Sequence, residues 1–294
     1  MAKLDKSQYT KEEWNTIKRL RRERKAEDRH KKATDRLVKQ SEHLGWETAT
    51  DLMWEEEDNA TRFVCCLKYG DKYSADYVNK LYDMVQRNLT LDHEFVCFTE
   101  DPTGINPNIR IESLPELPVK GWWFKPMFFN PNLALQGTLL FLDLDLIIFK
   151  NIDHLFKYEP GKFCIIRDFN RYIIKTYNKF NSSVFRLETG QHSNVYHDFV
   201  KDAKNITKRL QGDQDWIRAC ISNPNDFKYW PDDWIESYKW EMRNKPKFDT
   251  KPRGERDFLV NGDPKINPNT SIAVFHGDPN PHNCKDQWVI DNWK

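Results

Sequence analysis

Two aspartates lie two residues apart inside a nearly continuous apolar run. The run extends from Thr138 to Phe149, and only Asp143 and Asp145 break its apolar character after the first residue. On an extended strand, side chains two positions apart point to the same face. Two carboxylates in an apolar setting repel each other and lose solvation unless a cation lies between them. The spacing therefore predicts a strand that ends in a site for a hard divalent cation, Mg²⁺ or Mn²⁺, with open positions for phosphate oxygens. The alternative is a strand end whose aspartates meet water or cap a turn.

A second group of polar residues opens a predicted helix further along the chain. Asp213, Gln214 and Asp215 stand before an apolar helical run that ends at Ile221. Acidic residues at a helix N-terminus commonly cap free backbone N–H groups and interact favourably with the helix dipole. The same three side chains could instead project into a ligand site. The sequence leaves both interpretations open.

Two further segments place polar groups beside apolar runs. His276 ends a short run that predicts a strand, and Gly277 follows it. A single histidine at a strand end is either a metal ligand or a structural residue that hydrogen-bonds to its neighbours. Asn181, Ser182 and Ser183 place small polar groups just ahead of another predicted strand.

The elements that must position these groups alternate between strand and helix patterns. The runs over 62–67 and 94–99 predict buried strands, and apolar residues recur at helical spacing over 74–88, with Ser74 as the expected N-cap. This β-α-β order predicts an α/β, Rossmann-like fold with a mostly parallel central sheet and ligands at the carboxyl ends of the strands. No GxGxxG or GxxxxGK[ST] pattern occurs, so neither a dinucleotide site nor a P-loop gains support.

The composition limits the possible function classes. The 294 residues carry 46 Lys and Arg against 45 Asp and Glu, and the net charge of +1 excludes attraction of the whole chain to nucleic acid or acidic membranes. With 18 Phe, 11 Trp and 11 Tyr, the chain has enough apolar area for a core, which excludes disorder throughout. No apolar run reaches the roughly 18–20 residues that span a bilayer. Residues 1–20 lack a signal-peptide pattern, and the six cysteines have no CxxC spacing, so we expect a cytoplasmic protein with reduced thiols.

The N-terminal segment differs in charge from the rest of the chain. Residues 1–45 hold fourteen Lys and Arg against eight Asp and Glu, a net charge of +6, whereas residues 46–58 have a net charge of −6. With few apolar residues, the segment predicts one or two solvated helices; an arm that binds nucleic acid or a protein partner is the alternative. We therefore expect a charged helical extension over 1–58 and an α/β domain over 59–294.

In this order and context, the segments resemble the nucleotide-sugar-dependent glycosyltransferases of the GT-A fold. The resemblance extends from about Thr61 to His282. It is strongest to the glycogenin and bacterial lipopolysaccharide galactosyltransferase group, whose members retain the anomeric configuration of the sugar. It implies a GT-A domain over 59–294, a nucleotide-sugar donor, most often a UDP-sugar, and a bound Mn²⁺ or Mg²⁺.

The resemblance also implies a role for each motif. It assigns metal binding to Asp143, Asp145 and His276, with Asp143 also contacting the donor. It assigns catalytic positions facing the donor sugar to Asp213, Gln214 and Asp215. It assigns donor binding to Lys68, Tyr69, Tyr73, Asn181, Ser182, Ser183 and Gly277.

One position departs from the family's pattern. The family usually carries a Lys-Pro pair after the His-Gly pair, where the lysine reaches the diphosphate, but this chain has Asn280 and Pro281 at the corresponding place. Lys285 and Lys125 are two nearby lysines that could supply the missing positive charge at the donor.

The predicted function is metal-dependent transfer of a sugar from a nucleotide sugar to an acceptor, with retention of configuration. A glycan, a lipid-linked sugar, a protein side chain and a modified DNA base are all open as acceptors. One alternative is a non-catalytic protein that binds sugar nucleotides or partners on a transferase fold. The other is a metal-dependent phosphoesterase or nuclease, which would need a denser cluster of carboxylates and histidines for two metal ions.

Overall fold

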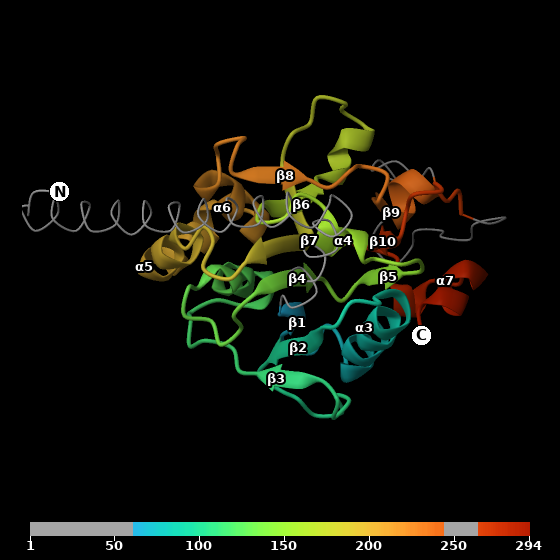
Figure 1. The fold of residues 1–294 in the computed structure, drawn as a ribbon, viewed down its shortest axis with the longest axis horizontal. Helices are drawn as coiled ribbons and strands as arrows, with labels where there is room; N and C mark the ends of the chain where they lie inside the picture. Colours follow the sequence, from blue (N-terminus) through green and yellow to red (C-terminus); the bar gives the residue numbers. More distant parts are fainter. Residues whose placement is uncertain (1–60, 244–263) are drawn as a thin grey trace, which may run out of the picture. The chain divides into compact units, whose positions relative to one another are not determined.

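A seven-stranded sheet forms the centre of the part of the chain that the computed structural model describes, residues 61–243 and 264–294 (Figure 1). Its strands are β1 Arg62–Lys68, β2 Glu94–Thr99, β3 Arg110–Glu112, β4 Thr138–Leu142, β6 Phe163–Arg167, β7 Phe180–Glu188 and β8 Phe227–Tyr229. They lie in the order β3-β2-β1-β4-β7-β6-β8. β7 is antiparallel to both of its neighbours, and every other neighbouring pair is parallel. The predicted α/β fold with a mostly parallel central sheet is confirmed.

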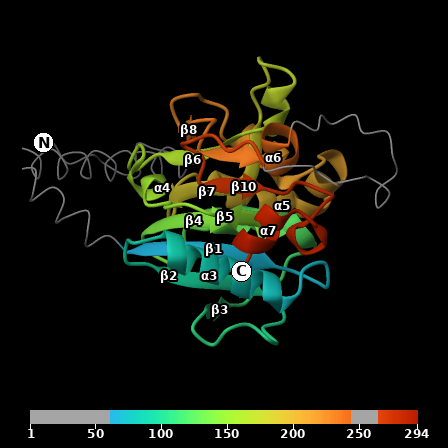
Figure 2. The same ribbon diagram turned by 90° about the vertical axis from the view of Figure 1, so that its right-hand side faces the viewer.

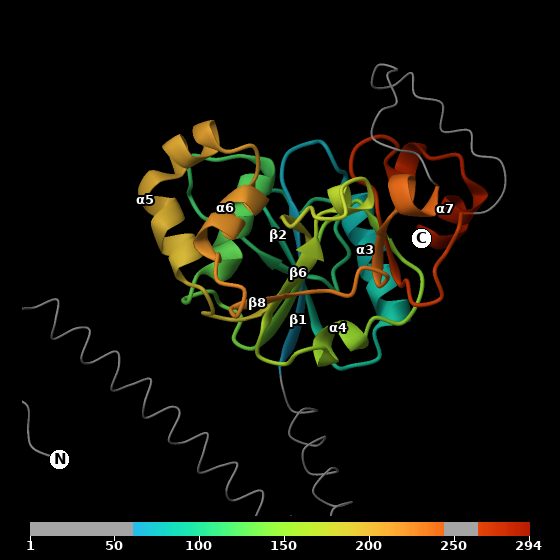
Figure 3. The ribbon, with the colours of Figure 1, turned by 90° about the horizontal axis from the view of Figure 1, so that it is seen from above.

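Different elements cover the two faces of this sheet (Figures 1 and 3). The helices are α3 Ala75–Asn88, α4 His154–Lys157, α5 Asn194–Arg209, α6 Asp213–Cys220 and α7 Gln287–Asn292. Helices α5 and α6 pack on one face together with the 3₁₀ segment Gly121–Phe129. Helices α3 and α7 pack on the other face. None of the helices in the described ranges is long and apolar enough to cross a membrane. The helical extension predicted over 1–58 lies outside these ranges.

The first β-α unit forms as its sequence predicts. Along β1, Val64 and Cys66 pack on the face covered by α3, whereas Phe63 and Cys65 pack on the opposite face. This alternation follows from the period of two residues in a strand. Helix α3 begins after Ser74 and buries its apolar stripe against the sheet. The Ser74 side chain makes no capping hydrogen bond, so the position of the predicted N-cap is right but the expected side-chain interaction is absent.

The strand that leads to the two aspartates ends just before them, as predicted, but the apolar residues that follow form part of a second, three-stranded sheet that the sequence did not predict. Its strands, in the order β5-β10-β9, are β5 Leu146–Ile148, β9 Ile235–Ser237 and β10 Ile272–Val274. Figure 2 faces the side of the molecule on which β5 and β10 lie with α7. The apolar run therefore forms two strands, because β4 pairs with β7 in the large sheet and β5 pairs with β10 in the small one. The two aspartates lie in the turn between them.

The polar segment at the start of β7 also differs from its prediction. Asn181, Ser182 and Ser183 lie within β7 rather than ahead of it. Val184 pairs with Leu142 at the end of β4, and the main-chain N–H of Asp143 donates to the Ser183 carbonyl oxygen at 2.8 Å. The serines therefore lie beside the aspartate turn because β7 runs antiparallel to β4.

The start of β4 includes a close contact that only glycine permits. Gly137 has φ +151°, and a Cβ atom at this position would lie 2.2 Å from the carbonyl oxygen of Thr61. The main-chain N–H of Thr138 donates to the same oxygen at 3.0 Å, so the pairing of β1 with β4 fixes the separation.

We expect Gly137→Ala to lower the free energy of unfolding by about 2–4 kcal/mol, because it combines backbone strain with steric overlap. Urea denaturation measures this loss. Gly161→Ala is the matched control, since Gly161 also has a positive φ, +71°, but a Cβ atom at that position would have nothing within 4 Å. Its loss should be only about 1–2 kcal/mol. Equal losses in the two variants would show that the contact with Thr61 is not the cause.

Candidate active site

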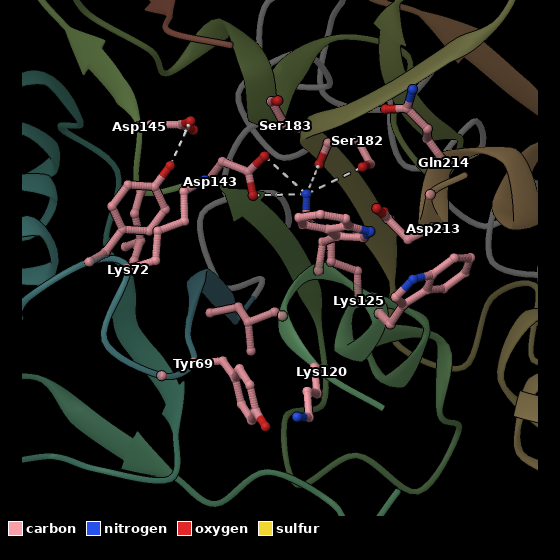
Figure 4. A pocket seen from close by; sticks show the side chains of 18 of the residues that line it. Tyr69, Lys72, Lys120, Lys125, Asp143, Asp145, Ser182, Ser183, Asp213 and Gln214 are labelled. Atoms are coloured by element: carbon pink, nitrogen blue, oxygen red, sulfur yellow. Dashed lines mark hydrogen bonds and ion pairs between the residues drawn. The ribbon is translucent and has the colours of Figure 1, made fainter. Parts of the chain in front are cut away.

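A cavity of about 710 Å³ opens where β1 and β4 end (Figure 4). One wall is the loop over 69–73 that follows β1, and another is the start of the 3₁₀ segment over 120–125. The start of α6 and the serines of β7 complete the lining, together with Asp143 and Asp145. Ligands of α/β sheets bind at this carboxyl edge, where the loops after parallel strands meet.

Asp143 forms an ion pair with a buried lysine. Lys125 Nζ lies 2.8 and 2.9 Å from the two carboxylate oxygens of Asp143. It also donates to the main-chain oxygen and the Oγ of Ser182, at 3.1 and 3.2 Å. Burial alone would lower the pKa of Lys125, but the charges of Asp143 and Asp213 outweigh burial and raise that pKa. Lys125 therefore stays charged and compensates for the charge of Asp143.

Asp145 has a neutral partner instead. The hydroxyl of Tyr73 donates to Asp145 Oδ2 at 2.9 Å. Burial and the charge of Asp143 raise the pKa of Asp145 to about 6, although the bond from Tyr73 and the charges of Lys72 and Lys125 oppose the shift. The ionised form of Asp145 is thus under-compensated, and a bound cation would lower its pKa.

Asp213 begins α6 and is only 4% exposed. Its Oδ2 atom is buried and has no hydrogen-bond partner among the described residues. Burial raises the pKa of Asp213, and the charge of Lys125 opposes this shift. Asp213 lines the cavity, and its unsatisfied oxygen lies within the cavity wall.

His276 lines the same cavity from the end of β10. Its ring stacks on Phe169 with a centroid separation of 5.2 Å and meets Trp240 edge-on at 4.5 Å. Nε2 shares a hydrogen bond with Ser237 Oγ at 2.5 Å. The imidazole is therefore held in one orientation by two aromatic rings and a hydroxyl.

The charges of the lining residues fit a cation. Four aspartates and three lysines line the cavity, which gives a formal charge of −1 with His276 neutral. The raised pKa of Asp145 shows where the uncompensated negative charge lies. Within 61–243 and 264–294, however, no group of three or more His, Cys, Asp or Glu side chains is placed to hold a metal ion by itself. A cation here would need oxygen ligands from water or from a bound substrate as well.

The structure brings most of the predicted site residues to this cavity. Those that line it are Tyr69, Tyr73, Lys125, Asp143, Asp145, Ser182, Ser183, Asp213, Gln214 and His276. Those that do not are Lys68, Asn181, Asp215, Gly277 and Lys285. The side chain of Lys68 points away from the cavity, because side chains alternate along a strand. Its Nζ donates to the Asp101 carbonyl oxygen at 3.4 Å.

Several lining residues have no counterpart in the sequence-based prediction. Lys72 and Lys120 add positive charge, and Trp122 is 52% exposed in the lining. Gln211 and Gly212 extend the wall that α6 begins. Lys72 lies between Tyr69 and Tyr73, both of which were predicted to bind the donor. Its position in that loop could therefore have identified it as a cavity residue from the sequence.

Comparison with known proteins identifies relatives by structure and not by sequence. No protein-family model matches the chain, and none of the curated proteins matches it. The glycosyltransferase GlyE from Streptococcus pneumoniae TIGR4 superposes with a TM-score of 0.55 and 12% identity, over 79% of this chain and 62% of GlyE. The galactosyltransferase LgtC, in complex with donor and acceptor sugar analogs, gives a TM-score of 0.54 and 12% identity, over 79% of this chain and 93% of LgtC.

The chain has a GT-A glycosyltransferase fold. The GT-A fold agrees with the predicted fold class and with the mostly parallel sheet whose carboxyl edge holds the cavity. The chain covers 62% of the GlyE chain, so part of GlyE has no counterpart in the superposition.

The raised pKa of Asp145 predicts a stability that depends on pH. Because the folded state binds this proton more tightly than the unfolded chain, ionising Asp145 costs stability between about pH 4 and pH 6, and the full cost remains above pH 6. We expect metal-free Asp145→Asn to be more stable than the unsubstituted protein by about 2–3 kcal/mol at pH 7.5, with the difference roughly halved at pH 5. Urea denaturation at both pH values measures it. A gain that does not change with pH would mean that packing, not charge, is responsible.

Proposed function

We propose that this chain is a glycosyltransferase that moves a sugar from a nucleotide-sugar donor, in the first place a UDP-sugar, to an acceptor nucleophile. A divalent cation, Mn²⁺ or Mg²⁺, takes part, and the anomeric configuration is retained. One observation carries the proposal: five polar residues converge in one cavity at the carboxyl edge of a GT-A fold. They are Asp143, Asp145, Asp213, Gln214 and His276.

Asp145 and His276 would hold the cation, with Asp143 contacting the cation, the ribose or both. When bound, the cation would neutralise the negative charge that develops on the leaving diphosphate. The under-compensated carboxylate of Asp145 supports this assignment, since its pKa is raised to about 6. Lys125 keeps Asp143 ionised and oriented through its ion pair.

The opposite wall is suited to the donor sugar. The carboxylate of Asp213, which lines the cavity, accepts a hydrogen bond from a sugar hydroxyl, and Gln214 stabilises the oxocarbenium-like transition state. Retention follows from a same-face substitution, in which the bond from the anomeric carbon to the leaving diphosphate breaks, the acceptor oxygen bonds to that carbon from the same side, and the leaving phosphate takes the proton of the acceptor. No covalent enzyme intermediate is then needed. Asp215 does not line the cavity and remains a residue of the first turn of α6.

The structures of related fold support a glutamine in such a site. One solved structure of LgtC is described as an active-site mutant in which glutamine is replaced by glutamate. Gln214 is a cavity-lining glutamine at the start of α6 in this chain.

A two-metal phosphoesterase or nuclease is the weaker alternative. Such enzymes hold two cations a few ångströms apart with several carboxylates or histidines. The described part of the chain has no group of three or more such side chains placed to hold a metal ion. A third possibility is a protein that binds sugar nucleotides without catalysis. Turnover of a donor separates it from the proposed glycosyltransferase.

The central experiment is incubation with a panel of nucleotide sugars and Mn²⁺, monitoring release of the nucleoside diphosphate. We expect slow hydrolysis of at least one donor without acceptor, and no release when the metal is removed with EDTA. Asp145→Asn should lower the rate at least 100-fold, because one missing cation ligand typically costs several kcal/mol of transition-state stabilisation. Asp83→Asn, an exposed aspartate of α3, is the control and should retain the rate. Binding without turnover by the unsubstituted protein would instead favour a sugar-nucleotide-binding protein.

Gln214→Ala should reduce the rate of donor turnover far more than it weakens binding of UDP, by about 100-fold against less than threefold. The contact of Gln214 with the donor sugar is expected to strengthen mainly in the transition state, and the loss of such a contact lowers kcat. Steady-state kinetics and calorimetric titration with UDP measure the two quantities. Gln86→Ala on the exposed surface of α3 should change neither. Equal losses of rate and UDP affinity would make Gln214 a simple binding residue.

A further inference from the structure

Lys72 is an exposed lysine in the loop between β1 and α3, and its role is not explained by the fold. We propose that Lys72 binds the second phosphate of the donor and thereby makes the site selective for diphosphate-linked over monophosphate-linked donors. This proposal rests on the function proposed above and deepens it by naming the residue that recognises the diphosphate.

Three lysines line the cavity, namely Lys72, Lys120 and Lys125, and the ammonium of Lys125 is already paired with other protein groups. Lys125 is 4% exposed, and its ammonium contacts the carboxylate of Asp143 and both oxygens of Ser182. An ammonium has three N–H donors, and these partners use all of them. A phosphate could reach Lys125 only by breaking a buried ion pair, so Lys125 is a poor candidate for diphosphate binding.

Lys72 is available and is held close to the candidate cation ligand. Its Nζ lies 4.5 Å from the centroid of the Tyr73 ring, within the range of a cation–π interaction. The hydroxyl of the same tyrosine bonds to Asp145 at 2.9 Å. Among the described residues, none forms an ion pair with Lys72 or accepts a hydrogen bond from it. The ammonium therefore lies next to the carboxylate that a diphosphate-bound cation would use, with its N–H groups open to phosphate oxygens.

The chemistry of lysine suits this task. The ammonium is a compact charge with three rotatable donors, and it binds phosphate as a point charge without a fixed geometry. The charge of Lys72 acts on Asp145, where it is one of the influences that lower the carboxyl pKa. Since the lining has a formal charge of −1, a diphosphate needs positive charge in addition to the cation.

Lys120 and Lys285 are placed less favourably for this role. Figure 4 shows Lys120 near Tyr69, on the side of the cavity away from Asp145 and Asp143. Lys285, which the sequence suggested for the diphosphate, does not line the cavity. Lys120 is therefore the matched control for Lys72, because both are exposed lysines of the same cavity.

The test compares the affinities of UDP and UMP, with the CDP/CMP and GDP/GMP pairs in parallel, by calorimetric titration in the presence of Mn²⁺. We expect the unsubstituted protein to prefer the diphosphate of its preferred base. Lys72→Met should reduce this preference about tenfold through the diphosphate affinity alone, as expected for the loss of one charged hydrogen bond. Lys72→Arg should keep most of the preference, and Lys120→Met should leave the ratio unchanged.

Two other outcomes would contradict the proposal. If Lys72→Met keeps the diphosphate preference, or loses monophosphate and diphosphate affinity equally, Lys72 does not bind the second phosphate. If the unsubstituted protein nevertheless binds a nucleoside diphosphate, the proposed glycosyltransferase function still stands without this role for Lys72. If it binds none of the six nucleotides, the proposed function itself fails.

Tyr73 is a positioning residue in this proposal. Tyr73→Phe keeps the ring under the ammonium and should keep the diphosphate preference, whereas Tyr73→Leu removes the ring and should reduce the preference. Equal preference in the two variants, measured by the same titrations, would show that the ring does not position Lys72.

Discussion

Two main-chain hydrogen bonds hold the turn that carries Asp143 and Asp145, and the geometry of the cavity depends on them. The N–H of Asp143 donates to the Ser183 carbonyl oxygen of β7, and the N–H of Phe275 donates to the Asp145 carbonyl oxygen, both at 2.8 Å. The first bond ties the turn to the large sheet and the second ties it to the end of β10. Because the chain crosses from one sheet to the other at this turn, Ser182 of β7 and His276 after β10 both line the cavity into which the turn opens.

One side of the cavity is a single buried polar network. Lys125 joins the carboxylate of Asp143 to Ser182, and its charge also interacts with the buried carboxylate of Asp213. These groups come from the 3₁₀ segment, the aspartate turn, β7 and α6, so the network fixes four elements relative to one another. Networks of this kind are costly when only partly satisfied. The buried Oδ2 of Asp213 is the point at which this network stays unsatisfied, because it has no hydrogen-bond partner among the described residues.

The sequence predicted the sheet well, because buried parallel strands read as short apolar runs and their carboxyl ends were marked by polar residues. It did not predict that the residues after Asp145 form β5 in a second sheet, since that strand is set by its pairing with β10 and not by any local signal. The Lys125–Asp143 ion pair was equally out of reach, because its partners lie on separate elements. The orientation of Lys68 was predictable. Strand alternation places Leu67 and Tyr69 in the cavity and the residue between them on the other face.

The two aspartates of the turn have different partners, and this difference separates their roles. Breaking the buried pair of Asp143 with Lys125 would leave an uncompensated charge, which typically costs about 3–5 kcal/mol, so Asp143 is a fixed part of the scaffold. Asp145 receives one hydrogen bond from the neutral hydroxyl of Tyr73, whose pKa is raised first by burial and then by the charge of Asp145. Tyr73 therefore remains a donor across the working pH range but cannot neutralise the carboxylate. A cation can, so Asp145 is the carboxylate whose partner is readily exchanged when a charged ligand enters the cavity.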